Sequence, residues 1–361
     1  MQIGLVGLPN SGKTTVFNAL TRGDAVTTAF SSGSLEINTK LVDVPDPRLE
    51  TLAQLYQPPK ITPARVEYAD IGGLRGDVER GISLSGEQLG HIAANHALIH
   101  VVRAFEDDNV PHPLQTINPQ RDIELLETEF LISDLSKIET RMPKLEANLG
   151  RGKSLPTYEA DKKEFETLTK IREALETDTP IRDLNLAGDE QKRTKGFQFL
   201  TEKPVMILIN LGDDDTPDTV AVSFPYQQSM ISYIRGRLEM DIVNLDAEDA
   251  ELFMAEYGLE DLSLNRIIAE SYRLLQRMVF FTAGDREVHA WEAPEQATAV
   301  TCAGIIHSDL ERGFIRAEVV AYEDLAAAGS EAAAKAAGTY RLEGRDYVVQ
   351  DGDVLLIRFN V

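Results

Sequence analysis

The sequence is poor in cysteine and has no long apolar segment. Its 361 residues include one cysteine, Cys302, which excludes an internal disulfide and any metal site built from several thiolates. A chain with so few thiols is typical of a reducing compartment. No run of about 18 apolar residues occurs, so we expect no transmembrane helix. The N-terminus starts directly with an apolar run, Met1 to Val6, and has no basic segment before it, so we expect no signal peptide and predict a cytoplasmic protein.

Basic residues are also scarce. The chain has 36 lysines and arginines against 59 acidic residues, a formal net charge of −23. Such a charge repels phosphate backbones at long range, which argues against bulk, nonspecific nucleic-acid binding but leaves a local basic patch open. Apolar residues make up 43% of the chain, as in ordinary folded proteins. The length predicts two or three units, each with its own core.

Five short apolar runs alternate with helix-length segments. This pattern is typical of buried parallel strands in an α/β sheet. The predicted strands are residues 3–6, 66–71, 97–102, 205–209 and 230–234.

The alternation stops between residues 122 and 203, where apolar residues take a helical spacing instead. The residues at intervals of four and three are Leu131, Leu135, Ile138, Met142, Leu145 and Leu149. A turn over 150–156 and a second apolar face over 158–175 complete the prediction of an inserted helical hairpin. Pro143 lies inside the first helix, and we expect it to kink that helix or to end it near Met142.

A third unit begins near residue 278. Strands are predicted over residues 279–282, 314–320, 347–349 and 354–359, with a helix-prone stretch over 326–337. The resulting domain prediction is a nucleotide-binding domain over 1–121 and 204–277, the hairpin over 122–203, and a small α+β domain over 278–361.

The strongest motif follows the first predicted strand. Residues Gly7 to Thr14 match G-x-x-x-x-G-K-[ST] in full, between a strand and an amphipathic helix. The glycines let successive N–H groups face a polyphosphate, and the helix adds its positive N-terminal end. Lys13 is predicted to reach the β- and γ-phosphates and Thr14 to ligate Mg²⁺. The motif predicts a P-loop that binds a purine nucleoside triphosphate.

An acidic residue is needed at a neighbouring strand end to hold the Mg²⁺ shell. Asp70 in Asp70-Ile71-Gly72-Gly73 meets this need, because the strand before it delivers the carboxylate to the ligand-binding edge of the sheet. Gly73 is predicted to donate its backbone N–H to the γ-phosphate and to act as a switch.

The base motif departs from the usual GTPase pattern. After the strand over 205–209 comes Asn210-Leu211-Gly212-Asp213, where GTPases carry N-K-x-D. Leu211 replaces the lysine that lies over the base, which weakens guanine recognition. Asp213 keeps the spacing of the carboxylate that pairs with guanine, so either purine remains open at this point.

Taken together, these segments resemble the YchF family, also called Obg-like ATPases. The resemblance covers nearly the whole chain. It is carried by residues 7–14, 44–49, 70–74, 100–108, 281–284, 313–317 and 346–354. It implies a P-loop domain that favours ATP, an inserted helical hairpin and a C-terminal TGS-type domain of ubiquitin-like β-grasp fold. It also implies slow hydrolysis and a partner in the ribosome, its RNA or its proteins; we expect a monomer.

The resemblance also assigns residues. The phosphates are expected to be wrapped by Asn10, Ser11, Gly12, Lys13, Thr14 and Thr15. Asn210 and the backbone of Leu211 are expected to read the adenine edge, with Asp213 close by. The Mg²⁺ ligands are expected to be Thr14, Ser34 and Asp70.

Four features differ from what the resemblance or Ras-like enzymes lead one to expect. Ser34 stands where the family has a switch threonine, and Asp213 where it has glutamate, which moves the base motif toward guanine. Residues 81–86 differ from the expected glycine-rich switch. Leu74 replaces the water-orienting glutamine of Ras-like enzymes, a replacement the family shares, so the attacking water must be placed in another way.

Three function hypotheses remain: an ATP-driven switch, the same switch run by GTP, and a ribosome- or protein-binding module with a structural nucleotide. A local basic cluster lies near the hairpin tip and its return end: Arg151, Lys153, Lys192, Arg193 and Lys195. It is either a solvated tip or an RNA contact. His96 and His100 are four residues apart, but His100 lies in an apolar strand, so we expect structural roles rather than a metal site.

Overall fold

The computed structural model describes residues 1–23, 25, 37–72, 84–259 and 261–360. They form two compact units, the first over Met1–Lys40 and Glu67–Ile267, the second over Leu41–Val66 and Ile268–Val361. The hairpin thus belongs to the first unit. Residues 41–66, which the sequence-based boundaries place in the nucleotide-binding domain, group with the C-terminal residues instead.

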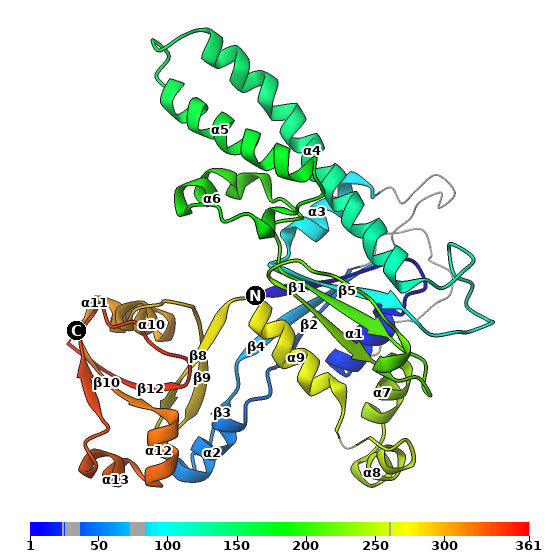
Figure 1. Cartoon of the computed structure of the whole chain (residues 1–361). Coiled ribbons are helices and arrows are strands. Elements are labelled where there is room, and N and C mark those ends of the chain that lie inside the picture. The colour runs from blue at the N-terminus through cyan, green and yellow to red at the C-terminus, as the bar shows by residue number, and fades with distance from the viewer. Residues whose placement is uncertain (24, 26–36, 73–83, 260, 361) are drawn as a thin grey trace. The chain divides into compact units, whose positions relative to one another are not determined.

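The first unit is built on a sheet with the strand order β2-β4-β1-β5-β6-β7 (Figure 1). Its strands are β1 (Gln2–Val6), β2 (Ile37–Asp43), β4 (Arg65–Ile71), β5 (Ala97–Arg103), β6 (Val205–Asn210) and β7 (Ser229–Ile234). The pairs β4–β1, β1–β5, β5–β6 and β6–β7 are parallel. All five predicted strands are confirmed. The edge strand β2 was missed because its residues are half-buried or exposed and give no apolar run.

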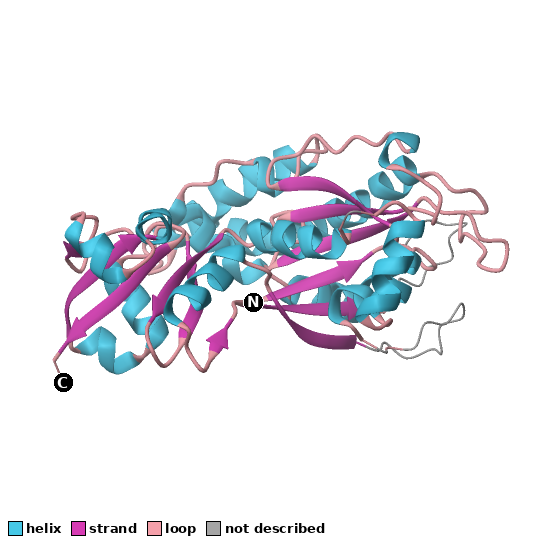
Figure 2. Ribbon diagram, turned by 90° about the horizontal axis from the view of Figure 1, so that it is seen from below, coloured by secondary structure: helices cyan, strands magenta, loops and turns pink. Residues whose placement is uncertain are grey.

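Helices cover both faces of this sheet (Figure 2). The helices of the unit are α1 (Lys13–Thr21), α3 (Gly86–Ala94), α4 (Pro119–Gly150), α5 (Tyr158–Leu175), α6 (Gly188–Thr194), α7 (Gly236–Val243), α8 (Ala247–Glu256) and α9 (Ser263–Leu274), which runs on into the second unit. Short 3₁₀ turns occupy Ile181–Asp183, Lys195–Phe197 and Pro217–Thr219. The main core joins β1, β5 and β6 to apolar residues of α3 and the start of α4.

The predicted hairpin is confirmed in α4 and α5, which lie side by side (Figure 1). Four of the six heptad residues, Leu131, Ile138, Met142 and Leu145, are buried against Leu168, Ile171 and Leu175 of α5. The expected helix end near Met142 is wrong, because α4 continues through Pro143 to Gly150. Pro143 lies on the exposed side of the helix, where water can satisfy the carbonyl that the proline leaves without a donor.

The second unit contains a mixed sheet with the order β11-β10-β12-β8-β9-β3. Its strands are β3 (Ile61–Thr62), β8 (Arg277–Ala283), β9 (Val288–Pro294), β10 (Phe314–Ala321), β11 (Arg341–Glu343) and β12 (Asp353–Phe359). Its helices are α2 (Pro47–Tyr56), α10 (Ala299–Ile306), α11 (Ser308–Arg312), α12 (Tyr322–Ala328) and α13 (Glu331–Ala336). The pairs β12–β8 and β3–β9 are parallel, and the pairs β10–β11, β10–β12 and β8–β9 are antiparallel.

Two details of the second unit correct the sequence analysis. The strand predicted over 347–349 is wrong, because only Val348 makes a bridge there, to Thr298. The helix-prone stretch over 326–337 is split into α12 and α13 at Gly329, whose φ of 69° a residue with a side chain rarely adopts.

Cys302 is buried in the core of the second unit, where burial raises the pKa of its thiol to about 12. The residue therefore behaves as a small apolar side chain.

The fold class predicted from the sequence is confirmed for the P-loop sheet and the inserted hairpin, while the TGS-type assignment of the C-terminal unit stays a prediction. None of the helices in the described ranges combines the length and hydropathy that crossing a membrane requires.

Asp134 is the main polar anchor at the base of the hairpin. Its fully buried carboxylate accepts hydrogen bonds from the backbone N–H groups of Leu200 and Thr201, at 3.0 and 2.8 Å, and from the Thr201 hydroxyl at 2.9 Å. We predict that Asp134→Ala lowers the free energy of unfolding by about 3 kcal/mol, because three buried donors lose their acceptor. Chemical denaturation measures this. Glu139→Ala, an exposed residue of the same helix, is the control, and equal small losses for both variants would contradict the prediction.

Candidate nucleotide site

The P-loop connects β1 to α1 through a backbone that requires glycine. Gly7 and Gly12 have φ values of 148° and 87°. A Cβ atom on Gly7 would lie 2.3 Å from the Val101 carbonyl oxygen, and one on Gly12 would lie 2.2 Å from Nδ2 of Asn210. The first turn of α1 has no side-chain cap, so its backbone N–H groups are available to an anion. This geometry fits the phosphate-wrapping role predicted for Asn10 to Thr15.

The Lys13 side chain packs against the P-loop, whose bound phosphates it is predicted to contact. Its side chain is buried, and Nζ donates hydrogen bonds to the carbonyl oxygens of Gly7, at 3.0 Å, and Leu8, at 2.9 Å. Burial lowers the pKa of Lys13 to about 8, and the charge of Asp70 opposes that shift. Two neutral carbonyls are weaker partners for an ammonium group than phosphate oxygens. Lys13 is therefore placed to exchange these carbonyls for a polyphosphate.

The two described residues predicted to bind Mg²⁺ lie together. The Thr14 hydroxyl donates to one carboxylate oxygen of Asp70 at 2.7 Å. The other oxygen of Asp70 is buried and has no partner among the described residues. Burial raises the pKa of Asp70, while the bond from Thr14 and the charge of Lys13 lower it. One hydroxyl and one carboxylate fit the oxygen ligands that Mg²⁺ takes beside a bound triphosphate.

His100 lies close to Lys13 on β5 but is not arranged as a metal ligand. It is 4% exposed, and its Nε2 has no hydrogen-bond partner among the described residues. Burial and then the charge of Lys13 lower its pKa to about 3, so the imidazole is neutral. His96 is placed differently, with Nδ1 accepting from the backbone N–H of Gln2.

Asn210, at the end of β6, uses its side chain to hold the site together. Its Nδ2 donates to the Ser11 carbonyl oxygen at 3.1 Å, and its Oδ1 accepts from the Gly236 N–H at 3.0 Å. The backbone N–H of Leu211 donates to Ile234, and its side chain is buried in the core. The Asn210 amide and the Leu211 N–H thus have partners within the protein, and the base-reading role of these two residues stays a prediction.

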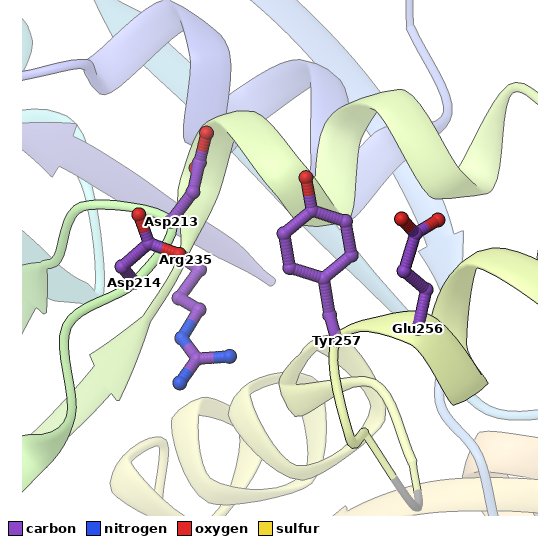
Figure 3. Close-up of a pocket in the computed structure, with 5 residues that line it drawn as sticks. All are labelled: Asp213, Asp214, Arg235, Glu256 and Tyr257. Carbon is purple, nitrogen blue, oxygen red and sulfur yellow. The ribbon is translucent and has the colours of Figure 1, made fainter.

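That loop borders an open pocket of about 390 Å³ lined by Asp213, Asp214, Arg235, Glu256 and Tyr257 (Figure 3). Asp213 is exposed there, and Asp215 caps the loop by accepting from the Gly212 N–H at 3.0 Å. The sequence analysis missed Arg235, Glu256 and Tyr257. Arg235 directly follows β7, so the rule that ligands bind at the carboxyl ends of parallel strands could have placed it beside the other strand-end residues. Glu256, the last residue of α8, and Tyr257, which follows it, belong to no motif.

Some predicted residues lie outside the described part of the chain. They are Ser34, Gly73, Leu74 and residues 81–83. The described residues stop at Gly72 and resume at Leu84. The switch roles predicted for these positions therefore rest on the sequence.

Comparison with known proteins adds an independent result. The ribosome-binding ATPase YchF of Bacillus subtilis is 40% identical to this chain over 366 residues, which cover 99% of both proteins. The chain belongs to the YchF family. A family model described as a 50S ribosome-binding GTPase matches residues 2–134, and the YchF-type GTPase C-terminal model, described as a protein of unknown function, matches residues 277–360.

Solved structures agree with this YchF assignment. The structure of the Schizosaccharomyces pombe YchF GTPase superposes with a TM-score of 0.85 at 29% identity, covering 99% of this chain and 97% of that one. A GTP-binding protein of Pyrococcus horikoshii matches along the full length of both chains with a TM-score of 0.57 at 18% identity, which supports the fold alone. The resemblance inferred from the motifs is thus confirmed.

Proposed function

We propose that this chain is a Mg²⁺-dependent ATP hydrolase that acts as a slow conformational switch on the ribosome. The observation that carries the proposal is the P-loop site, with buried Lys13 and the Thr14–Asp70 pair, in a chain that matches proteins named ribosome-binding ATPases along its whole length. A cytoplasmic monomer is part of the proposal.

The site residues divide the chemistry. The backbone of Asn10 to Thr15 binds the phosphates, and Lys13 stabilises the charge that develops on the γ-phosphoryl group. Thr14 and Asp70 would hold Mg²⁺, with Ser34 joining them in the triphosphate state; the ion neutralises phosphate charge. Gly73 donates to the γ-phosphate, so that hydrolysis releases the segments around Ser34 and Gly73.

ATP is the proposed substrate because the base motif lacks the residue that covers guanine in GTPases. Leu211 is 4% exposed and packs into the core, so its side chain does not lie over a base. GTP is the alternative, favoured by Asp213, which is exposed at the pocket and has the length of the guanine-reading carboxylate.

Titration calorimetry with nonhydrolysable ATP and GTP analogues in Mg²⁺ separates the two purines. We expect the ATP analogue to bind more tightly. We expect Asp213→Ala to weaken only GTP binding, because adenine has no N1–H or 2-amino group for the carboxylate to accept from. Asp218→Ala, an exposed acid of the same loop, serves as the control. Tighter binding of GTP to the unmodified protein would mean that Asp213 sets the preference and would overturn the ATP assignment.

The hairpin is the proposed ribosome contact. Its tip, with Arg151 and Lys153, is exposed and basic in a chain of net charge −23. In a binding module with a structural nucleotide, the same contact would form whether or not the nucleotide is present.

Co-sedimentation with ribosomes tests both ideas. We predict more bound protein with a nonhydrolysable ATP analogue than without nucleotide, and reduced binding of Lys153→Glu because the tip then repels RNA phosphates. Lys144→Glu, an exposed lysine earlier on α4, is the matched control. Equal binding with and without nucleotide, together with no measurable turnover, would favour the binding module over the switch.

A further inference from the structure

Arg103 is a buried cation whose partners are almost all backbone carbonyls. It ends β5 and is 3% exposed. Its guanidinium donates to the carbonyl oxygens of Phe105 at 3.0 Å, Val110 at 2.7 Å and Asp107 at 3.4 Å. Arg103 forms no ion pair with the described residues. Burial lowers its pKa, and the charge of Asp107 opposes that shift. Since an isolated buried charge is costly, these carbonyls must compensate for its lost hydration. The side chain thereby folds the loop from 104 to 111 around itself.

The first part of this loop lies between the two halves of the nucleotide site. The Arg103 guanidinium carbon is 4.4 Å from the centre of the Phe105 ring. A Cβ atom on Gly12 would be 3.7 Å from the edge of that ring, and one on Gly212 would be 3.8 Å from Cβ of Phe105. Phe105 therefore lies beside both the P-loop and the base motif, with room for little more than a methyl group between them. The N–H of Ala104 donates to the Asn210 carbonyl oxygen at 2.9 Å, which joins the loop to the end of β6.

The far end of the loop is tied down as well. Asn10 of the P-loop, in the left-handed region with φ of 62°, donates from Nδ2 to the Pro111 carbonyl oxygen at 2.9 Å. The next residue, His112, pairs with Asp122 of α4 at 2.9 Å and accepts from the Leu114 N–H at 3.1 Å. Both ends of the loop are thus fixed by other groups, and Arg103 holds the residues between them through their carbonyl oxygens.

We propose that Arg103 is a positioning residue for nucleotide binding, which holds the Phe105 ring as the wall against which the purine packs. The inference rests on the proposed function, because it assumes that the P-loop binds a nucleoside triphosphate. Removing the guanidinium takes the donor away from the carbonyls of Phe105 and Val110, whereas the Asp107 carbonyl keeps the Val110 N–H at 3.1 Å. The loop between its tethers then loses its main internal support. The ring then loses its fixed place, and the base loses a stacking partner. The phosphate part of the site keeps the bridge from Asn210 to Ser11.

The main experiment compares an ATP analogue with Mg²⁺-tripolyphosphate, which has no base. For Arg103→Gln we expect the affinity for the ATP analogue to fall about tenfold or more, while tripolyphosphate affinity changes by less than about threefold. In turnover assays the KM for ATP should rise more than kcat falls. Arg103→Lys keeps the charge but not the planar set of donors, so its affinity for the ATP analogue should lie between those of the unmodified protein and Arg103→Gln. Arg286→Gln, an exposed arginine of the second unit, is the matched control.

A tryptophan reporter tests the position of the ring directly. Because Trp291 is the single tryptophan, Phe105→Trp in a Trp291→Phe background places the fluorophore at the site alone. We expect the ATP analogue to quench this signal, tripolyphosphate to leave it unchanged, and Arg103→Gln to abolish the quenching. Thermal melting checks that each variant is folded, and Arg103→Lys replaces Arg103→Gln if the latter does not fold.

The outcomes separate this inference from the proposed function. If the unmodified protein does not bind the ATP analogue, the proposed function fails. If it binds and Arg103→Gln binds equally well, or if the reporter is not quenched with Arg103 in place, the positioning role of Arg103 is wrong. Equal losses for the ATP analogue and tripolyphosphate would also overturn it, since they would indicate a general structural role.

Discussion

The nucleotide site depends on one buried amide. Asn210 is 3% exposed and links the Ser11 carbonyl of the P-loop to the Gly236 N–H at the start of α7, across separations of 199 and 26 residues. Gly12 of the P-loop must lack a side chain for this amide to fit. A hydrogen bond buried in this way has little competition from water, and its loss leaves both partners unsatisfied. The same side chain therefore holds the P-loop beside the end of β6 and the start of α7.

A second set of contacts extends from this site to the hairpin. At the start of the loop from 104 to 112, the N–H of Ala104 donates to the Asn210 carbonyl oxygen, and the next residue, Phe105, lies beside the P-loop. At its end, His112 pairs with Asp122 in the first turn of α4. The same helix is 32 residues long and ends at Gly150, next to the basic tip. The phosphate loop and the proposed ribosome contact thus lie at the two ends of one continuous set of packed elements, an arrangement that suits a switch.

Much of this architecture could be predicted from the sequence because its signals are local. The P-loop is a contiguous motif, Asp70 follows a buried apolar run, and the hairpin has regular helical spacing. The resemblance to the YchF family, now confirmed, was also visible in short contiguous segments. The burial of the Leu211 side chain agrees with the prediction that it does not replace the base-covering lysine.

The remaining features depend on contacts between residues distant in sequence. Asn210 carries a motif position, yet that its amide binds the P-loop follows only from the packing of β6 beside β1 and β5. Residues 41–66 group with the C-terminal unit because β3 pairs with β9, and a two-residue strand has no detectable pattern. Pro143 gives a strong local signal for a helix end, but the packing of Met142 and Leu145 against α5 keeps the helix intact. Arg103 gives no signal at all, because its partners are backbone carbonyls.

The proposed function requires that a triphosphate be hydrolysed at the P-loop with the help of Lys13. The decisive measurement is single-turnover hydrolysis of Mg²⁺-ATP by the unmodified protein and by Lys13→Ala. We expect slow turnover by the unmodified protein and no measurable turnover by Lys13→Ala, because Lys13 is the buried cation bonded to the P-loop carbonyls. Hydrolysis by Lys13→Ala at the unmodified rate would show that Lys13 has no part in the reaction.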